Sequence, residues 1–305
     1  MSADSGSFEQ GIDLGGDSRF RSVLKSVWRF VRTQPLGTMG ILVIITIAVL
    51  AIFADHVHTS DPKGFNRNFL EAPSGDHFFG TNRNGQDLWS RVVYGARPAL
   101  ILGLGAVGVA MFVATILALL AGFFGGLIDA LLSRLVEILI AVPQILWLLM
   151  LTTAFDRSIQ TLIFAIAFAF SPITLRVLRG NVIQEAAVPY VEAARVIGAS
   201  SPRIMLRHIL PNVAPLMIVI ASITIPAALL AEAGLTFLGL GLEPGTASWA
   251  MDLGGGARAH FASGWWLPVF PGAALAVTVL SFNLLGDSLR DVLDPRLRGS
   301  GSGMI

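Results

Sequence analysis

Residues 188–211 have the sequence VPYVEAARVIGASSPRIMLRHILP, the longest polar interruption in the second half of an otherwise apolar chain. The first part of this stretch predicts a short helix. Pro189 fits the first helical position, where its missing N–H is no loss. Gly198 fits the residue after the helix end, because glycine tolerates a left-handed backbone. Ala193 and Ala194 are small enough to let another backbone come close.

The second part of the stretch predicts another short helix. Ser200 or Ser201 can cap its start, and Pro202 stands near its first turn. Pro211 is expected to end it. A small, charged pair of helices between two membrane spans is typical of a surface that docks onto another protein.

The composition restricts the class of protein. Of the 305 residues, 54% are hydrophobic and 13% charged, whereas soluble domains have about 25% charged residues. The net charge of +1 gives no electrostatic case for nucleic acid. The absence of cysteine excludes disulfides, thiol catalysis and thiolate metal sites. No P-loop motif is present, so we expect a membrane conduit that does not itself bind ATP in that way.

Charge-free stretches indicate how often the chain crosses a membrane. A span needs about 20 apolar residues. Six stretches qualify, namely 33–54, 98–128, 138–155, 158–175, 209–231 and 261–286. The third span is expected to begin near Asp129 and to bend at Pro143. The sequence therefore predicts an all-α integral membrane protein with six transmembrane helices.

Arginine and lysine are more numerous on the side that holds both ends and the polar stretch, which predicts that this side is cytoplasmic. The expected organisation is a cytoplasmic tail with an amphipathic helix (1–35), a first span with an extracytoplasmic loop (36–97), a five-helix core (98–288) that contains the polar loop (180–211), and a cytoplasmic C-terminal tail (289–305).

The polar stretch resembles the EAA loop of ABC importer permeases, in which Glu-Ala-Ala is followed after three residues by Gly and later by Leu-Pro. In that family the loop sits in a cleft of the cytoplasmic ATPase and transmits its motion. The resemblance implies that ATPase coupling involves Glu192, Ala193, Ala194, Arg195, Gly198, Ala199, Ser200, Pro202, Arg203, Leu210 and Pro211. The run from Arg207 to Asn212, with His208 where the general pattern prefers Ile, resembles the peptide and nickel branch.

Other segments extend the resemblance over residues 78–297. Residues 79–87 resemble a signature of the C-type permease of dipeptide and oligopeptide importers, except that Asn82 and Gln86 replace the usual Asp and Arg. This exchange suggests that an ion pair is lost. The glycines of residues 121–126 permit a tight turn and close helix packing, and residues 281–295 give a further match.

The resemblance implies the fold of a type I ABC importer permease with a cytoplasmic coupling helix, in the cytoplasmic (inner) membrane. It implies as partners a second, B-type permease, two ATP-binding subunits that hold ATP and Mg, an extracytoplasmic substrate-binding protein, and membrane lipid. The chain itself would be no enzyme and hold no cofactor. The cargo would be a di- or oligopeptide; nickel or another small solute is the alternative. A secondary transporter is a further alternative, but we see no internal repeat, and it would leave the polar loop unexplained.

Ionisable groups inside spans need a partner or a wet cavity. Glu137, Glu232 and Asn283 are candidates for the translocation path. The alternatives are that Glu137 pairs with Arg134, that Glu232 reaches the membrane interface, and that Asn283 hydrogen-bonds a neighbouring helix. His56, His58 and His77 share the outer loop, but no fourth ligand is indicated, and we expect no metal site.

Overall fold

The computed structural model describes residues 28, 30–61, 64, 69–259 and 264–293. Within these ranges the chain forms helices and loops, with a single isolated β-bridge between Thr81 and Asp87. The helices are α2 (Pro35–Ile52), α3 (Ala54–Val57), α4 (Leu88–Phe124), α5 (Gly126–Ala141), α6 (Gln144–Ala154), α7 (Ile159–Ala186), α8 (Pro189–Val196), α9 (Ser201–Ile204), the π-helical turn η1 (Met205–Ile209), α10 (Leu210–Phe237), α11 (Trp249–Ala259) and α12 (Trp266–Leu293).

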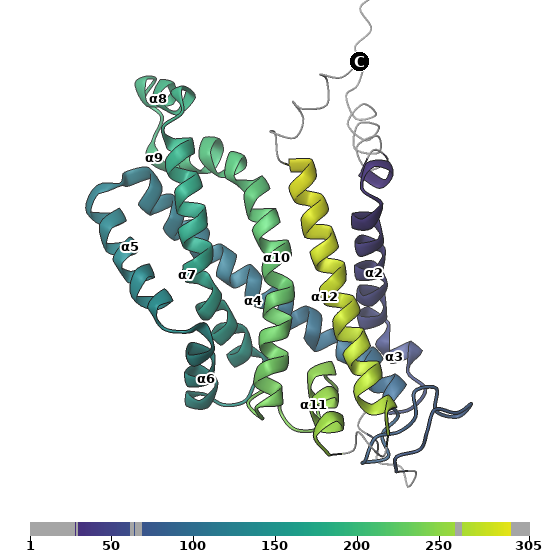
Figure 1. The fold of residues 1–305 in the computed structure, drawn as a ribbon. Coiled ribbons are helices and arrows are strands. Elements are labelled where there is room, and N and C mark those ends of the chain that lie inside the picture. Colours follow the sequence, from purple (N-terminus) through teal and green to yellow (C-terminus); the bar gives the residue numbers. More distant parts are fainter. Residues whose placement is uncertain (1–27, 29, 62–63, 65–68, 260–263, 294–305) are drawn as a thin grey trace, which may run out of the picture.

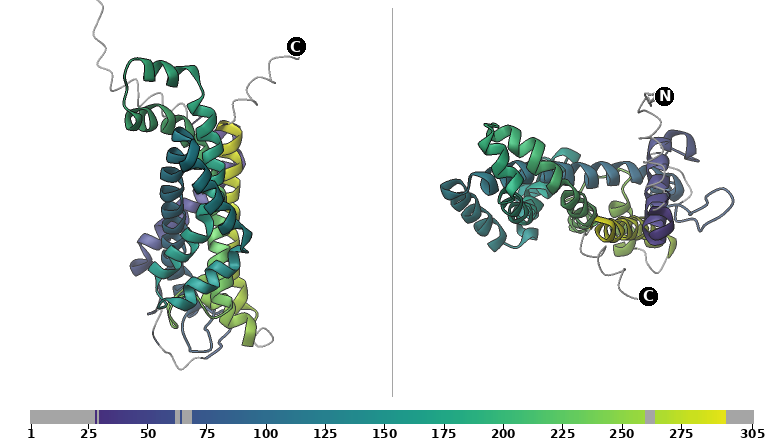
Figure 2. Two further views of the ribbon diagram at one scale, coloured as in Figure 1. Left: turned by 90° about the vertical axis from the view of Figure 1, so that its left-hand side faces the viewer. Right: turned by 90° about the horizontal axis from the view of Figure 1, so that it is seen from above.

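The long helices form one bundle with two distinct ends (Figure 1). One end carries α8 and α9, the start of α2 and the end of α12; the other carries α11 and the loop between α3 and α4. Seen from above in the right-hand view of Figure 2, the bundle is longer in one direction than in the other, and α4 runs across it. Most of the predicted amphipathic helix and most of the C-terminal tail fall outside the described residues.

Among the described residues, five helices are long and apolar enough to cross a membrane, and α5 with α6, bent by 86°, make a sixth if the pair is one span. The prediction of an all-α membrane protein is therefore confirmed, and the predicted six spans agree with this larger count. The bend falls between Ala141 and Gln144, where Pro143 was expected to distort the helix. Val142 has an extended backbone, with φ −87° and ψ 127°, as expected for a residue before proline.

The second span begins earlier than the charge pattern predicts. α4 starts at Leu88, so Arg91, Tyr94 and Arg97 are helical, and their placement in the outer loop was wrong. The charges are compatible with the helix because other groups satisfy them. For example, Arg97 donates to the carbonyl oxygen of Ala51 at 2.6 Å and pairs with Asp55 at 2.7 Å.

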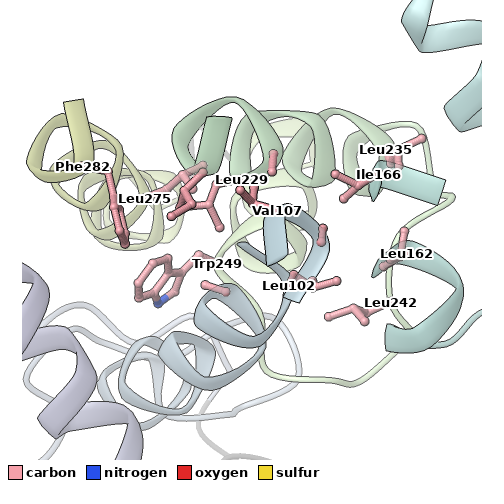
Figure 3. Packing of buried hydrophobic residues seen from close by; sticks show 14 of the residues in the cluster. Leu102, Val107, Leu162, Ile166, Leu229, Leu235, Leu242, Trp249, Leu275 and Phe282 are labelled. Atoms are coloured by element: carbon pink, nitrogen blue, oxygen red, sulfur yellow. The ribbon is translucent and has the colours of Figure 1, made fainter. Parts of the chain in front are cut away.

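The two larger of the three hydrophobic cores in the described residues follow one another along the bundle. The core at the α11 end joins α2, α4, α6, α7, α10, α11 and α12, and Figure 3 shows Leu102, Ile166, Leu229 and Trp249 among its members. The core at the α8 end joins α4, α5, α7, α8, α9 and α10. There, α4 and α7 pack so closely at Gly122 that a Cβ atom on this residue would lie 2.6 Å from Val182.

The glycines between α4 and α5 form a tight turn, as predicted. Gly125 and Gly126 both have positive φ, at 63° and 55°, which glycine adopts without steric cost. By contrast, the expectation that Pro211 ends the second short helix was wrong. The helix widens into η1, in which the Leu210 N–H donates to the Met205 carbonyl, and continues as α10 with Pro211 in its first turn. A proline is tolerated there because it interrupts no regular α-helical bond.

Candidate functional site

A compact projection, residues 189–204, extends beyond the end of the bundle; we call it the knob (Figures 1 and 2). It consists of α8 and α9, and Pro189 and Pro202 stand in their first turns, as predicted. Gly198 joins the two helices with a φ of 81°, which confirms the left-handed residue. The Ala199 N–H donates to the Ala194 carbonyl at 3.0 Å and closes the turn.

The outer surface of the knob combines charge with two apolar side chains. Glu192, Ala193 and Arg195 are exposed. At the tip, Val196 is 82% and Ile197 83% exposed, the highest values among the exposed large apolar side chains of the described residues. Sequence reasoning missed this pair, although two adjacent apolar residues directly before a helix-ending glycine were a usable signal. Large apolar groups this exposed on a polar projection indicate a protein contact.

The inner surface of the knob packs onto its own bundle. Ala194 is only 5% exposed and lies in the same core cluster as Val191 and Ile204. The expectation that Ala193 and Ala194 both face another chain therefore needs correction, because only Ala193 is exposed. The two residues differ by one position, which turns a side chain by about 100° around a helix.

Hydrogen bonds and a ring contact fix the knob to the bundle. The Tyr190 hydroxyl donates to Glu185 at 2.7 Å and accepts from the Asn212 amide at 2.9 Å, which joins α7, α8 and α10. Burial and the bond to Glu185 raise the pKa of Tyr190, so the hydroxyl stays protonated at neutral pH. On the other side, the Arg195 guanidinium lies 4.8 Å from the centre of the Phe123 ring at the end of α4. The knob is thus fixed to the helices that carry it.

The remaining residues predicted for this site lie at its margins. Ser200, Pro202 and Arg203 are exposed on the knob, and Ala199 is half-buried between its helices. Leu210 and Pro211 lie at the foot of the knob, at the start of α10. A hollow of about 510 Å³ lies beside α8 and is lined by Ala186, Ala187, Val188, Glu192, Arg195 and Val196.

At the opposite end of the bundle, Asp87 organises the loop before α4. Its carboxylate accepts from the backbone and hydroxyl of Ser90, from Thr59 at 2.8 Å, and lies 3.0 Å from Nδ1 of His77. Burial alone would raise the pKa of Asp87, but the hydrogen bonds from Ser90, His77 and Thr59 outweigh it and hold the pKa below its usual value.

A second polar cluster ties this loop to α11. The buried Arg91 pairs with Asp252 at 2.7 Å and donates to Gln86 at 3.1 Å. Asn82 donates to the same Gln86 side chain at 2.9 Å, so these two positions are paired as neutral amides. A hydrogen bond between positions 82 and 86 thus takes the place of the ion pair that was expected to be lost. Beside them is a hollow of about 240 Å³ with amide, guanidinium and apolar walls.

The three residues expected on the translocation path do not meet. Glu137 lies on α5 and pairs with Arg134 at 2.9 Å, with both side chains exposed. Glu232, on α10, is 4% exposed and accepts from Thr236 at 3.0 Å, so its carboxylate is enclosed by its own chain. Asn283 is exposed on α12, on the other side of the bundle from α5 (Figure 1). Among the described residues it forms no hydrogen bond to a neighbouring helix. A role in a path formed with a partner stays a prediction.

No cluster of three or more His, Asp or Glu side chains suited to a metal ion occurs in the described part of the chain. The three histidines that were expected to share an outer loop have other neighbours. His77 contacts Asp87, His56 meets the edge of Phe53, and His58 lies against Tyr94.

Comparison with known proteins agrees with this architecture. Residues 114–299 match the family described as binding-protein-dependent transport system inner membrane component. The chain is 35% identical to the probable D,D-dipeptide transport system permease protein of Escherichia coli (strain K12), over 91% of this chain and 93% of that protein. It is 33% identical to the dipeptide transport system permease protein of Bacillus subtilis (strain 168), over 91% and 87% of the two chains. A glutathione transport system permease protein of Escherichia coli O6:K15:H31 (strain 536 / UPEC) is 38% identical, over 89% and 90%.

Proposed function

Because the chain belongs to the family of binding-protein-dependent transport system inner membrane components, we propose that its knob couples ATP hydrolysis to peptide movement. The chain is the permease subunit of a peptide ABC importer, a multi-pass membrane protein that works with other components of the transport system. The relatives are transport permeases, which fits a subunit that carries out no catalysis of its own.

The observation that carries the coupling role is the exposed tip of the knob. Val196 and Ile197 project beside Glu192, Ala193 and Arg195, while Tyr190 and Arg195 fix the knob to the ends of α4, α7 and α10. A partner ATPase that grips the tip would therefore move these helices together. Such rigid-body movement is a common basis of switching between outward-open and inward-open states.

The finer arrangement is part of the same proposal. The knob, the start of α2 and the end of α12 would face the cytoplasm across the inner membrane, and the loop before α4 would face the binding protein. A second, B-type permease would complete the cargo path, and two ATPases would supply ATP and Mg. The cargo would be a di- or oligopeptide, by analogy with the names of the relatives.

Single cysteines test the orientation, because the chain has none of its own. Ser200 on the knob and Ser74 in the outer loop are both exposed. In intact cells, an impermeant thiol reagent should label Ser74→Cys but label Ser200→Cys only after the membrane is opened. Labelling of Ser200→Cys from outside would contradict the proposed coupling to a cytoplasmic ATPase.

A further inference from the structure

A polar hollow interrupts the apolar outer surface between α5 and α7. That surface is made by exposed side chains such as Leu127, Leu131 and Ile138 of α5. The hollow has a volume of about 130 Å³. Its walls are Leu132, Ser133, Val136, Glu137, Leu175, Arg176 and Arg179. The mechanism proposed above uses neither the hollow nor its arginines.

The charges around the hollow leave one cation without a counter-charge. Arg179 is paired with Asp129, and Glu137 is paired with Arg134 at 2.9 Å. Arg176 is exposed and, among the described residues, has no acidic side chain within ion-pair distance. A charged group in this position is costly in hydrocarbon unless a counter-charge reaches it from outside the chain.

A hydroxyl in the same hollow also has no partner. The Ser133 Oγ is shielded from solvent and forms no hydrogen bond in the described structure. A buried hydroxyl without a partner is unfavourable, whereas an oxyanion beside it would accept its hydrogen bond. Arg176 and Ser133 thus offer a charged donor and a neutral donor to one ligand.

The depth of the hollow suits a lipid headgroup. Gly122, near the end of α4, packs on Val182 of α7, so Val182 lies close to the knob end of the bundle. Arg176 is six residues away from Val182 along α7, or about 9 Å. A long arginine side chain bridges most of such a distance by extending toward the interface. Basic pockets between spans on the cytoplasmic side are typical sites for anionic lipid headgroups.

We propose that this hollow binds the phosphate of an anionic phospholipid in the leaflet on the knob side. The Arg176 guanidinium would hold the phosphate. The Ser133 hydroxyl, which is shielded in the present orientation, would donate to a second oxygen once its side chain turns toward the hollow. The Glu137 carboxylate at the rim does not oppose this, because Arg134 neutralises it. The hollow borders the exposed leucines of α5, which favours lipid over cargo. Only the naming of the leaflet as cytoplasmic rests on the proposed function.

Lipid retention by the complete transporter tests the proposal. The complex is exchanged into mixed vesicles of phosphatidylglycerol and phosphatidylcholine, extracted, and its bound lipids are counted by native mass spectrometry. Arg176→Gln should weaken phosphatidylglycerol retention about tenfold or more, since it removes a charge-assisted contact. Ser133→Ala should weaken it less, and Arg176→Lys should retain most of it. Arg157→Gln, which removes an exposed cation at the other end of the bundle, is the matched control.

Equal retention by Arg176→Gln and Arg157→Gln would overturn the proposal. Displacement of the lipid by saturating dipeptide would assign the hollow to cargo, and displacement by millimolar inorganic phosphate would assign it to a free anion; either result also overturns it. Peptide uptake is measured separately with the parent complex in the same mixed vesicles. Failure of that uptake would contradict the proposed function, whereas loss of lipid retention in Arg176→Gln would still support the lipid site.

Discussion

Replacement of Val196 and Ile197 by serine tests the coupling surface most directly. Both side chains are more than four-fifths exposed and lie at the tip of the knob, so the change should cost the free subunit little stability. Full burial of a Val or Ile side chain contributes about 1.5–3 kcal/mol. If an ATPase covers both, their loss should weaken its association by about 3–4 kcal/mol, which is a factor of a few hundred.

The measurement is the concentration of ATPase subunits needed to restore peptide-stimulated ATP hydrolysis to reconstituted permease. The double variant should need a few hundred times more ATPase, while the permease pair remains in the membrane at the parental level. Phe78→Ser is the control, because it removes an exposed apolar side chain at the opposite end. If the double variant and the parent require the same ATPase concentration, the tip is not the docking surface.

Three further predictions concern the knob and the outer loop. Ala193→Arg should leave the permease stable but lower coupled ATP hydrolysis. Ala194→Arg should instead destabilise the subunit itself by at least about 3 kcal/mol, because it buries a charge. Unfolding curves in detergent should show a loss of stability for Ala194→Arg and none for Ala193→Arg. Gly198→Val should assemble, because a Cβ atom at this position meets no other atom. It should transport poorly, because a left-handed backbone costs valine about 1–2 kcal/mol. Gly198→Asn should have a milder effect, and uptake assays measure the difference. The folded pKa of Asp87 is depressed, so its contribution to stability is present above the unfolded value of 3.8 and is lost as the pH falls through the lower folded value. The protection of amides near His77, which is their exchange rate relative to the intrinsic rate at the same pH, should be constant from pH 7 to pH 5 and fall only below about pH 4.

The elements that the sequence predicted correctly depend on strong local rules. Six apolar stretches predicted six spans because hydrocarbon excludes charge. The bend at Pro143 and the left-handed Gly198 followed from the backbone chemistry of those residues. The polar loop identified the knob through residue spacing, and the knob's two short helices formed where the prolines indicated.

The errors arise where a distant contact decides the outcome. α4 starts ten residues before its charge-free stretch because groups elsewhere in the chain, such as Asp252 and Asp55, neutralise Arg91 and Arg97. Likewise, which of two adjacent alanines faces outward depends on the angle at which α8 rests on its core. Composition and spacing carry no information about either arrangement.

Contacts at the two ends of α4 connect the knob with the opposite end of the subunit. The knob rests on the core at the α8 end, and Arg195 contacts Phe123 at the end of α4. At the other end of the same helix, Arg91 pairs with Asp252, and the Trp249 indole donates to the Val92 carbonyl at 2.7 Å. α4 has 37 residues and is therefore about 55 Å long. Because α4 carries both attachments, it offers a direct route by which a tilt of the knob could reach α11 and the loop before α4, where we propose that the binding protein delivers its cargo.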